Sequence, residues 1–183
     1  MMLLLDSLSA QTIRFRLAMP ADAAFIHSLR SNERYNQHLS QTQGGEIEQR
    51  LWLENYKQRE LDGKEYYFII ERIDGVPIGT VRLYDFRPDI NSFCWGSWIL
   101  NEHKTSTAAI ESTLLVYHVG FYLLAFAQSH FDVRLENQHV IRFHLKTGAM
   151  ETHRDEQDVF FVFNRDNHQV LLQKFGRYLS PSL

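Results

Sequence analysis

The chain has 183 residues, of which 44% are hydrophobic and 22% are charged. This length and composition fit one well-buried α/β domain spanning residues 1–183 and are short for two domains. The formal net charge of −3 and the pI near 6.3 provide no bulk attraction to nucleic acid or to an anionic membrane. Neither nucleic acid nor membrane is therefore expected as a partner.

Cysteine use and the first residues indicate a reducing compartment. Cys94 is the single cysteine, so no internal disulfide can form, and its apolar aromatic surroundings favour a small buried thiol. The apolar residues 1–5 are followed at once by Asp6, which is too short a run for a signal sequence, and no later apolar run approaches membrane-spanning length. We expect a soluble cytoplasmic protein.

In the first half of the chain the hydrophobic period switches between two and about 3.6 residues, which is typical of mixed strands and helices. The spacing predicts a strand over 13–17, a helix over 20–30 that begins near Pro20, and a polar connection over 31–45. A second helix follows over 46–61. Strands over 66–73 and 76–84 form a predicted hairpin around Asp74 and Gly75.

The second half begins with a strand over 93–100 and a long apolar helix over 108–127. Next come a predicted strand over 131–135, a helix over 138–147 and a strand over 159–163. Asn164 is a suitable N-cap for a terminal helix that ends near Tyr178. No repeat or low-complexity segment interrupts this order.

The region from Trp95 to Ala149 carries the most specific pattern. A strand-like WGSWIL leads through the polar turn NEHKTSTA into a helix, and LENQHVIRFHLKTGA follows about thirty residues later. This order resembles the acyl-CoA-binding half of the GNAT superfamily of N-acetyltransferases. The resemblance implies a single-domain α/β (α+β) fold, with a mixed central sheet of about seven strands, flanking helices and a splayed central strand pair. It places the acyl-CoA half at about 93–150 and the acceptor-side helices at about 20–62.

The polar turn matches the position where the family holds the cofactor pyrophosphate on backbone N–H groups at a helix start. His103, Ser106 and Ala108 occupy the places of the family's Gln/Arg, Gly and Gly/Ala, so the motif is degenerate. The alternative is an ordinary strand-to-helix turn with Thr105 or Thr107 near the N-cap. The resemblance implies acetyl-CoA as co-substrate, with these turn residues around its phosphates: His103, Lys104, Thr105, Ser106, Thr107 and Ala108.

The later motif matches the family's Asn-led helix in spacing. Asn137 would contact the pantetheine arm or the adenine side, although it could equally be a simple helix cap, and Phe143 and Lys146 complete the cofactor-side pattern. His144 replaces the family's Tyr and is the predicted proton donor to the departing thiolate. The alternative for His144 is a histidine at the edge of the core.

The strand over 93–100 is expected to splay from its neighbour and expose backbone groups to pantetheine and to the thioester oxygen. Trp98, Ile99 and Leu100 are the residues chosen for these contacts. A protonated amine must lose a proton before it attacks, and the candidate bases are Tyr84, Asp85, Glu102, His103 and Glu136, each of which could also be a solvated strand end. The scattered histidines and the single cysteine predict no metal site.

Substrate specificity is expected from the N-terminal third, where Arg30, Asn32 and Trp52 would line the acceptor wall together with Tyr84 and Asp85. Arg30 or Arg34 could pair with a diphosphate and aromatic rings could stack on a base or sugar. The chain looks like GNAT members that acetylate nucleotide-activated amino sugars for surface polysaccharides. It is also similar, less specifically, to the ribosomal-protein N-terminal acetyltransferases.

We therefore expect an acetyl-CoA-dependent N-acetyltransferase that transfers directly through a ternary complex, as a monomer or homodimer. An amino-sugar nucleotide is the leading acceptor. The alternatives are a protein N-terminus or another small amine, and a GNAT-fold binding protein that has lost catalysis.

Overall fold

A computed structural model describes residues 8–37, 44–181 and 183, so the expectation for residues 1–5 lies outside it. Seven strands form one sheet in the order β1-β2-β3-β4-β5-β7-β6. Only the β4–β5 pair is parallel, so the predicted mixed sheet is confirmed. The strands are β1 (Ile13–Leu17), β2 (Tyr66–Arg72), β3 (Pro77–Arg87), β4 (Ser92–Leu100), β5 (Gln128–Arg134), β6 (Met150–Arg154) and β7 (Asp158–Asn164).

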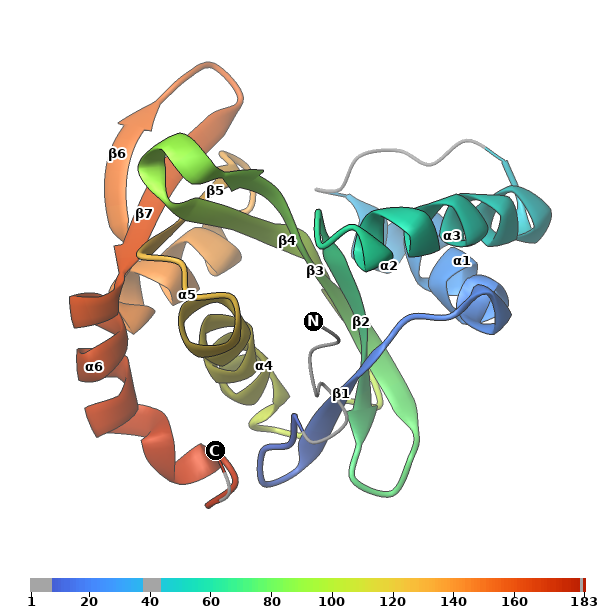
Figure 1. Ribbon diagram of the computed structural model, residues 1–183, viewed down its shortest axis with the longest axis horizontal. Coiled ribbons are helices and arrows are strands. Elements are labelled where there is room, and N and C mark those ends of the chain that lie inside the picture. The colour runs from blue at the N-terminus through green and yellow to red at the C-terminus, as the bar shows by residue number, and fades with distance from the viewer. Residues whose placement is uncertain (1–7, 38–43, 182) are drawn as a thin grey trace.

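Helices cover both faces of the sheet (Figure 1). On one face lie α1 (Ala23–Ser31), the short α2 (Glu33–Asn36) and α3 (Glu46–Leu61); on the other lie α4 (Ala108–His118), α5 (Gln138–Thr147) and α6 (Arg165–Phe175). Strand β2 is buried on both sides because its side chains alternate: Tyr67 and Ile69 join the cluster with α1 and α3, while Phe68 joins the larger core.

The predicted helix over 108–127 is shorter in the structure. Helix α4 ends at His118 and continues only as a π turn over Val119–Leu123. Gly120 lies against the ring of Phe93, and a Cβ at this position would collide with that ring. The chain then turns through Ala125, whose φ is 61°, to enter β5. The close approach of Phe93 on β4 therefore requires glycine at position 120, within the π turn that follows α4.

Two short elements differ from the sequence expectation. Strand β6 was not predicted, because its sequence METHR is exposed throughout and shows no alternation of apolar and polar residues. It forms by antiparallel pairing with β7. Helix α2 lies inside the expected connection over 31–45, and the Asn32 side chain caps it by accepting from the backbone N–H of Arg34.

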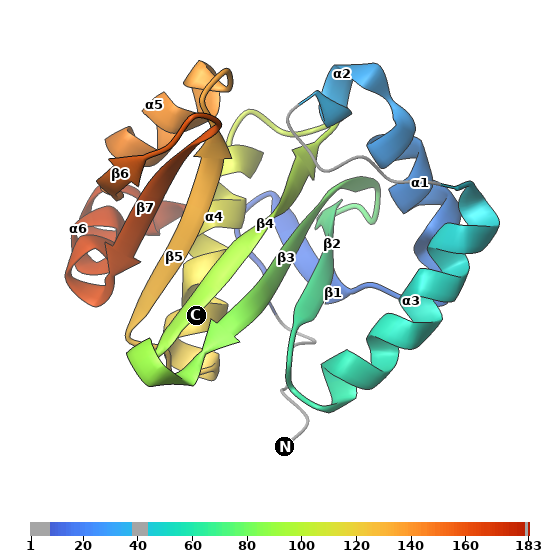
Figure 2. The same cartoon turned by 90° about the horizontal axis from the view of Figure 1, so that it is seen from above.

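The central strands β4 and β5 diverge, which confirms the expected splayed pair. Their parallel pairing runs only from Ser92 to Cys94 on β4 and from Gln128 to His130 on β5. Beyond Cys94 the two strands separate, as the view from above shows (Figure 2). Ser97 adds a bulge, with φ of 48° and a register shift opposite β3. Residues 95–100 of β4 therefore present a backbone edge that β5 does not cover.

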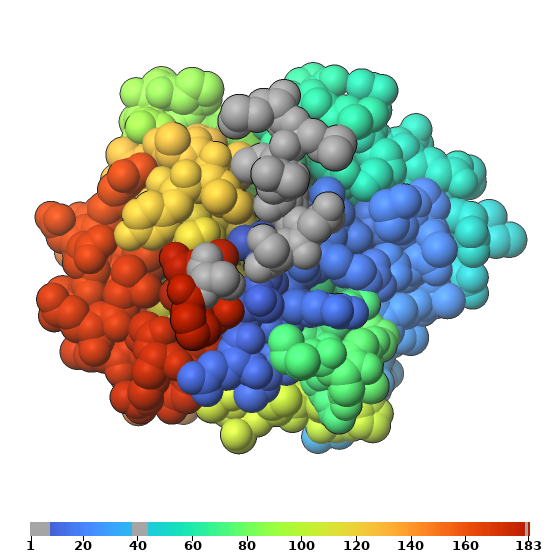
Figure 3. All heavy atoms as spheres, turned by 60° about the horizontal axis from the view of Figure 1, so that its bottom comes forward, coloured from blue at the N-terminus to red at the C-terminus, as the bar shows by residue number. Residues whose placement is uncertain are grey.

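The two ends of the described chain lie side by side. Ala10 forms a β-bridge with Leu179, and the backbone N–H of Gln11 donates to the carbonyl of Tyr178 at 3.0 Å. Figure 3 shows the C-terminal residues against the N-terminal segment on this face of the molecule. These contacts hold the residues that lead into β1.

Candidate active site

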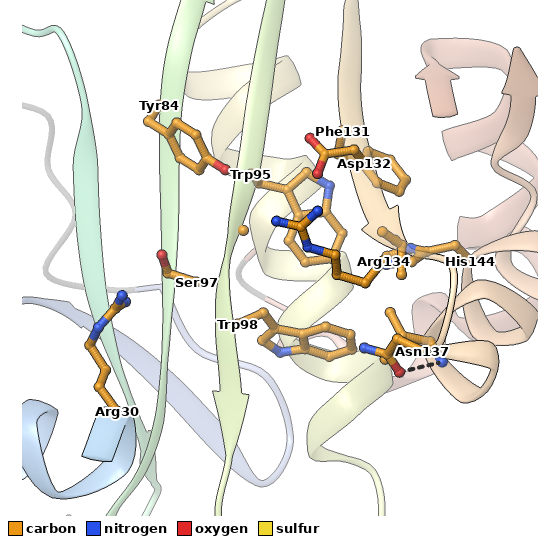
Figure 4. Close-up of a pocket in the computed structure, with 13 residues that line it drawn as sticks. Arg30, Tyr84, Trp95, Ser97, Trp98, Phe131, Asp132, Arg134, Asn137 and His144 are labelled. Atoms are coloured by element: carbon orange, nitrogen blue, oxygen red, sulfur yellow. Dashed lines mark hydrogen bonds between the residues drawn. The ribbon is translucent and has the colours of Figure 1, made fainter. Parts of the chain in front are cut away.

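The opening between β4 and β5 contains a pocket of about 190 Å³, here called the V pocket (Figure 4). Its walls come from β4, β5 and α5, with Arg30 of α1 and Tyr84 of β3 at one side. The predicted residues Trp98, Asn137 and His144 meet there. The lining residues are Arg30, Tyr84, Trp95, Gly96, Ser97, Trp98, Phe131, Asp132, Val133, Arg134, Asn137, Val140 and His144.

A second pocket of about 520 Å³ lies between the sheet and helices α1 and α3, here called the α3 pocket. It shares Arg30, Tyr84 and Ser97 with the V pocket, so the two pockets adjoin at these residues. The predicted acceptor residue Trp52 lines it. The lining residues are His27, Arg30, Gly44, Gly45, Glu48, Gln49, Trp52, Tyr67, Arg82, Tyr84 and Ser97.

Arg82 is fixed at the floor of the α3 pocket. Its Nε donates to the carboxylate of Glu65 at 2.7 Å, and Glu65, only 4% exposed, also accepts from Arg59. Arg82 lies over the rings of Trp52, at 5.2 Å, and Tyr84, at 4.9 Å. One carboxylate therefore serves two guanidinium groups, and the charged side chains that line the pocket itself are Arg30, Arg82 and Glu48.

Tyr84 sits where the pockets join. Gly96 leaves room for its hydroxyl, since a Cβ on Gly96 would lie only 2.9 Å from the Tyr84 oxygen. Burial, followed by the neighbouring Cys94, raises the pKa of Tyr84. Burial likewise raises the pKa of the Cys94 thiol to about 12, and Cys94 is buried as predicted. Tyr84 therefore keeps its proton at neutral pH and can donate a hydrogen bond into the V pocket.

His144, the predicted proton donor, is buried among aromatic rings. Its ring is 3% exposed and packs on Phe131, at 4.5 Å between ring centroids, and on Trp95, at 5.3 Å. Burial lowers the pKa of His144 to about 3, and its Nδ1 finds no partner among the described residues. The imidazole is neutral at physiological pH and is a poor source of a proton, so the burial does not support the predicted general-acid role.

The turn before α4 has the donors that an anion requires. The backbone N–H groups of Thr105, Ser106, Thr107, Ala109 and Ile110 donate to no group in the described part of the chain. Thr107 is the N-cap residue but makes no side-chain cap, because its hydroxyl donates to Glu111 at 2.5 Å. A helix start with unpaired amides favours a phosphate group, so this donor set fits the pyrophosphate of acetyl-CoA.

The remaining predicted residues lie outside both pockets. Asp85 pairs with Arg87 and His130, and Glu102 accepts from the hydroxyl of Tyr35. Phe143 packs its ring on Trp98 at 5.4 Å. Ile99 and Leu100 continue β4 opposite Thr80 and Gly79. Asn32 caps α2, while Lys146 and Glu136 are exposed and line neither pocket.

Sequence reasoning missed Arg82, Ser97, Asp132 and Arg134, all of which line a pocket. The alternation in β5 could have identified two of them. Phe131 and Val133 are buried, so Asp132 and Arg134, which alternate with them along the strand, must point to the opposite face.

The described residues contain neither a candidate metal site nor a candidate membrane-spanning helix. No group of three or more His, Cys, Asp or Glu side chains there is placed to hold a metal ion. No helix in residues 8–37 or 44–181 is long and apolar enough to cross a membrane.

A mixed sheet that opens between two parallel strands, beside a helix start with unpaired amides, defines an acyl-CoA-dependent N-acetyltransferase fold. The sequence profile described as "Acetyltransferase (GNAT) domain" matches residues 12–150. The chain belongs to this GNAT acetyltransferase family, and it is an N-acetyltransferase that uses acetyl-CoA.

Solved structures agree with this assignment. The structure described as "Apo FdhC- a nucleotide-linked sugar GNAT" is 48% identical, with a TM-score of 0.88 over 94% of this chain and 98% of that one. A spermidine N-acetyltransferase from Vibrio cholerae in complex with CoA and spermine is 20% identical, with a TM-score of 0.74 over 86% of this chain and 98% of that one. A GCN5-related N-acetyltransferase from Brucella melitensis is 16% identical, with a TM-score of 0.77 over 96% of this chain and 86% of that one. The last two show the fold alone. No curated protein matches the chain.

Proposed function

We propose that this enzyme acetylates an amino group on a nucleotide-linked sugar. The α3 pocket carries the argument, because it combines cationic side chains with an indole plane directly beside the V pocket. Arg30 and Arg82 suit a diphosphate, and Trp52 offers a surface for a base or a sugar ring. The 48% identity to a nucleotide-linked sugar GNAT supports the same acceptor class.

The V pocket and the uncovered edge of β4 are the proposed site of the pantetheine arm. Backbone groups of residues 95–100 are not paired with β5 and can form hydrogen bonds with amides of an extended ligand. The unpaired N–H groups at the start of α4 lie beyond the end of this strand and would hold the pyrophosphate. Acetyl-CoA supplies an activated acetyl group at this position.

Direct transfer through a ternary complex follows from the adjoining pockets. An amine held in the α3 pocket reaches the V pocket past Tyr84 and Ser97 without a covalent enzyme intermediate. A backbone N–H at the β4 bulge can stabilise negative charge on the acetyl oxygen. The protonated Tyr84 hydroxyl can donate to the departing thiolate, which assigns it the role expected from sequence for His144.

A thiol-release assay with a panel of amines tests the acceptor. The panel contains nucleoside-diphosphate-linked aminodeoxy sugars, the same nucleotide sugars with hydroxyl in place of the amine, spermidine, and short peptides with free Ser, Thr or Ala N-termini. We expect turnover of amino sugars and none of their hydroxyl counterparts. Turnover confined to peptides or spermidine would contradict the acceptor assignment, and acetyl-CoA binding without any turnover would favour a binding protein.

A further inference from the structure

Asp132 is a carboxylate at the opening of the V pocket. The last parallel pair joins Cys94 to His130, so Gly96 and Asp132, each two residues further along its strand, face one another where β4 and β5 begin to separate. Side chains two residues apart in a strand share a face, which puts Asp132 on the side of Cys94 and Tyr84. Figure 4 shows Asp132 and Tyr84 on opposite walls of the opening.

Asp132 contrasts with the carboxylates that stabilise the fold. Glu65 is bound by two arginines, Glu71 by Arg14 and Arg16, and Glu111 by threonine hydroxyls and backbone amides. No hydrogen bond or ion pair joins the carboxylate of Asp132 to another residue of the described ranges; its one local contact is with its own backbone N–H, although it lines a pocket. Its acceptor capacity is therefore available to a ligand in the V pocket.

The groups around Asp132 make it a stronger base than an ordinary aspartate. Partial burial raises its pKa, and the carboxylates of Asp158 and Asp155, from β7 and the turn before it, act in the same direction. Arg134 on β5 opposes them. The other titratable or charged groups that line the V pocket are Tyr84 on β3, Arg30 on α1 and the buried His144 on α5, and Cys94 on β4 lies beside Tyr84.

We propose that Asp132 is the base that takes the proton from the acceptor's ammonium group before acetyl transfer. This inference rests on the proposed function, in which the acceptor is an amine delivered past Tyr84. A carboxylate at this place also attracts the ammonium group electrostatically and so selects amines over hydroxyls.

The proton and bond changes balance with no further reactant. The ammonium gives one proton to Asp132 and becomes a neutral amine with a free electron pair. The amine nitrogen then bonds to the acetyl carbon and the carbon–sulfur bond breaks, with the electron pair leaving on sulfur. The second proton lost from nitrogen neutralises the thiolate, through Tyr84 or water, and Asp132 returns its proton to solvent.

The test compares Asp132→Asn with Asp89→Asn, a control that removes an exposed carboxylate that lines neither pocket. The substrate is whichever amine of the panel above the wild type acetylates fastest. Asp132→Asn should lower kcat by about 10²–10⁴-fold at neutral pH. In the wild type, kcat/KM should rise with pH as Asp132 loses its proton. This rise should be absent in Asp132→Asn, whose activity should increase only at the higher pH where the amine in solution loses its own proton. Asp132→Glu should recover part of kcat.

Two measurements separate this role from a structural one. The stabilisation of the fold by acetyl-CoA should be the same in Asp132→Asn and wild type. The carboxyl carbon of Asp132, followed by NMR, should titrate above the ordinary aspartate range. A variant with wild-type kcat and pH profile, or one that raises only the acceptor KM, would overturn the proposal. If the enzyme acetylates spermidine or a peptide but no sugar nucleotide, the acceptor assignment is contradicted. The Asp132 variants are then compared on the amine that is acetylated. No turnover with any amine contradicts both.

Discussion

Thr12 donates twice to the carboxylate of Glu111, across a separation of 99 residues. Its backbone N–H and its hydroxyl each lie 2.9 Å from a Glu111 oxygen, and the backbone N–H of Ile13 adds a contact at 3.2 Å. Glu111 is fully buried one turn into α4, and it also accepts from Thr107 in the turn before the helix. One side chain therefore ties the start of β1 to the turn that would hold the cofactor phosphates.

Replacing Glu111 should affect stability and cofactor binding together. Glu111→Ala leaves the buried backbone N–H of Ile13 and the partly buried N–H of Thr12 without this acceptor, so urea denaturation should show a loss of about 3 kcal/mol. At a hundred times its Kd, acetyl-CoA should stabilise the wild type by about 2.7 kcal/mol. Glu111→Gln should weaken this effect by loosening the turn, while Glu54→Ala on the exposed side of α3 should leave both quantities unchanged. An unaltered acetyl-CoA shift in Glu111→Gln would contradict the positioning role.

Arg30 and Arg34 were equivalent candidates in the sequence and are not equivalent in the structure. Arg30 lines both pockets, whereas Arg34 is exposed on α2 and lines neither. Loss of a charge-assisted contact to a diphosphate costs about 1.5–3 kcal/mol, so Arg30→Ala should raise the KM for a nucleotide sugar by roughly 10- to 100-fold. Arg34→Ala should change it by less than about twofold. Equal effects of the two substitutions would indicate a bulk charge effect.

Substitutions of Tyr84 and of His144 should have different effects on kcat. Tyr84→Phe removes a hydroxyl that can donate to the thiolate and should lower kcat by about 10²–10⁴-fold with little change in acetyl-CoA affinity. His144→Phe replaces a buried neutral ring by another ring and should change kcat by less than about tenfold. If His144→Phe instead caused the larger loss, the role expected from sequence would be restored to His144.

Two buried histidines should make the protein sensitive to mild acid. Burial lowers the pKa of His144 to about 3 and that of His168 to about 4, the latter helped by His118. The unfolded imidazoles bind protons near pH 6.5 while the folded ones do not, so stability is full above pH 6.5 and falls as the pH drops below it. Each group contributes a slope of up to about 1.4 kcal/mol per pH unit. Urea denaturation between pH 6.5 and 5 should show this loss, and His144→Phe should reduce the slope by about half. If the pH dependence of stability is unchanged in His144→Phe, groups other than His144 cause it.

The order of elements and motifs along the chain is enough to predict the fold and the enzyme class. Hydrophobic periodicity located most of the strands and helices, because one-sided burial leaves a period of two or 3.6 residues in the chain. It could not locate β6, which is exposed on both sides, or the end of α4, because the apolar run continues through the π turn over Val119–Leu123. The order of the motifs between Trp95 and Ala149 indicates the acetyltransferase family.

The set of side chains that share the candidate site depends on the folded arrangement of the chain. Folding brought Arg30, Trp52, Trp98, Asn137 and His144 to two adjoining pockets and left Glu102, Asp85 and Lys146 outside them. It also added Asp132, whose position follows from the register of β4 with β5. The protonation state of His144 and Tyr84 could not be predicted from residue type, because desolvation is set by neighbours that are distant in the chain. A sequence pattern records local periodicity, whereas pocket geometry and pKa depend on contacts between segments that only folding brings together.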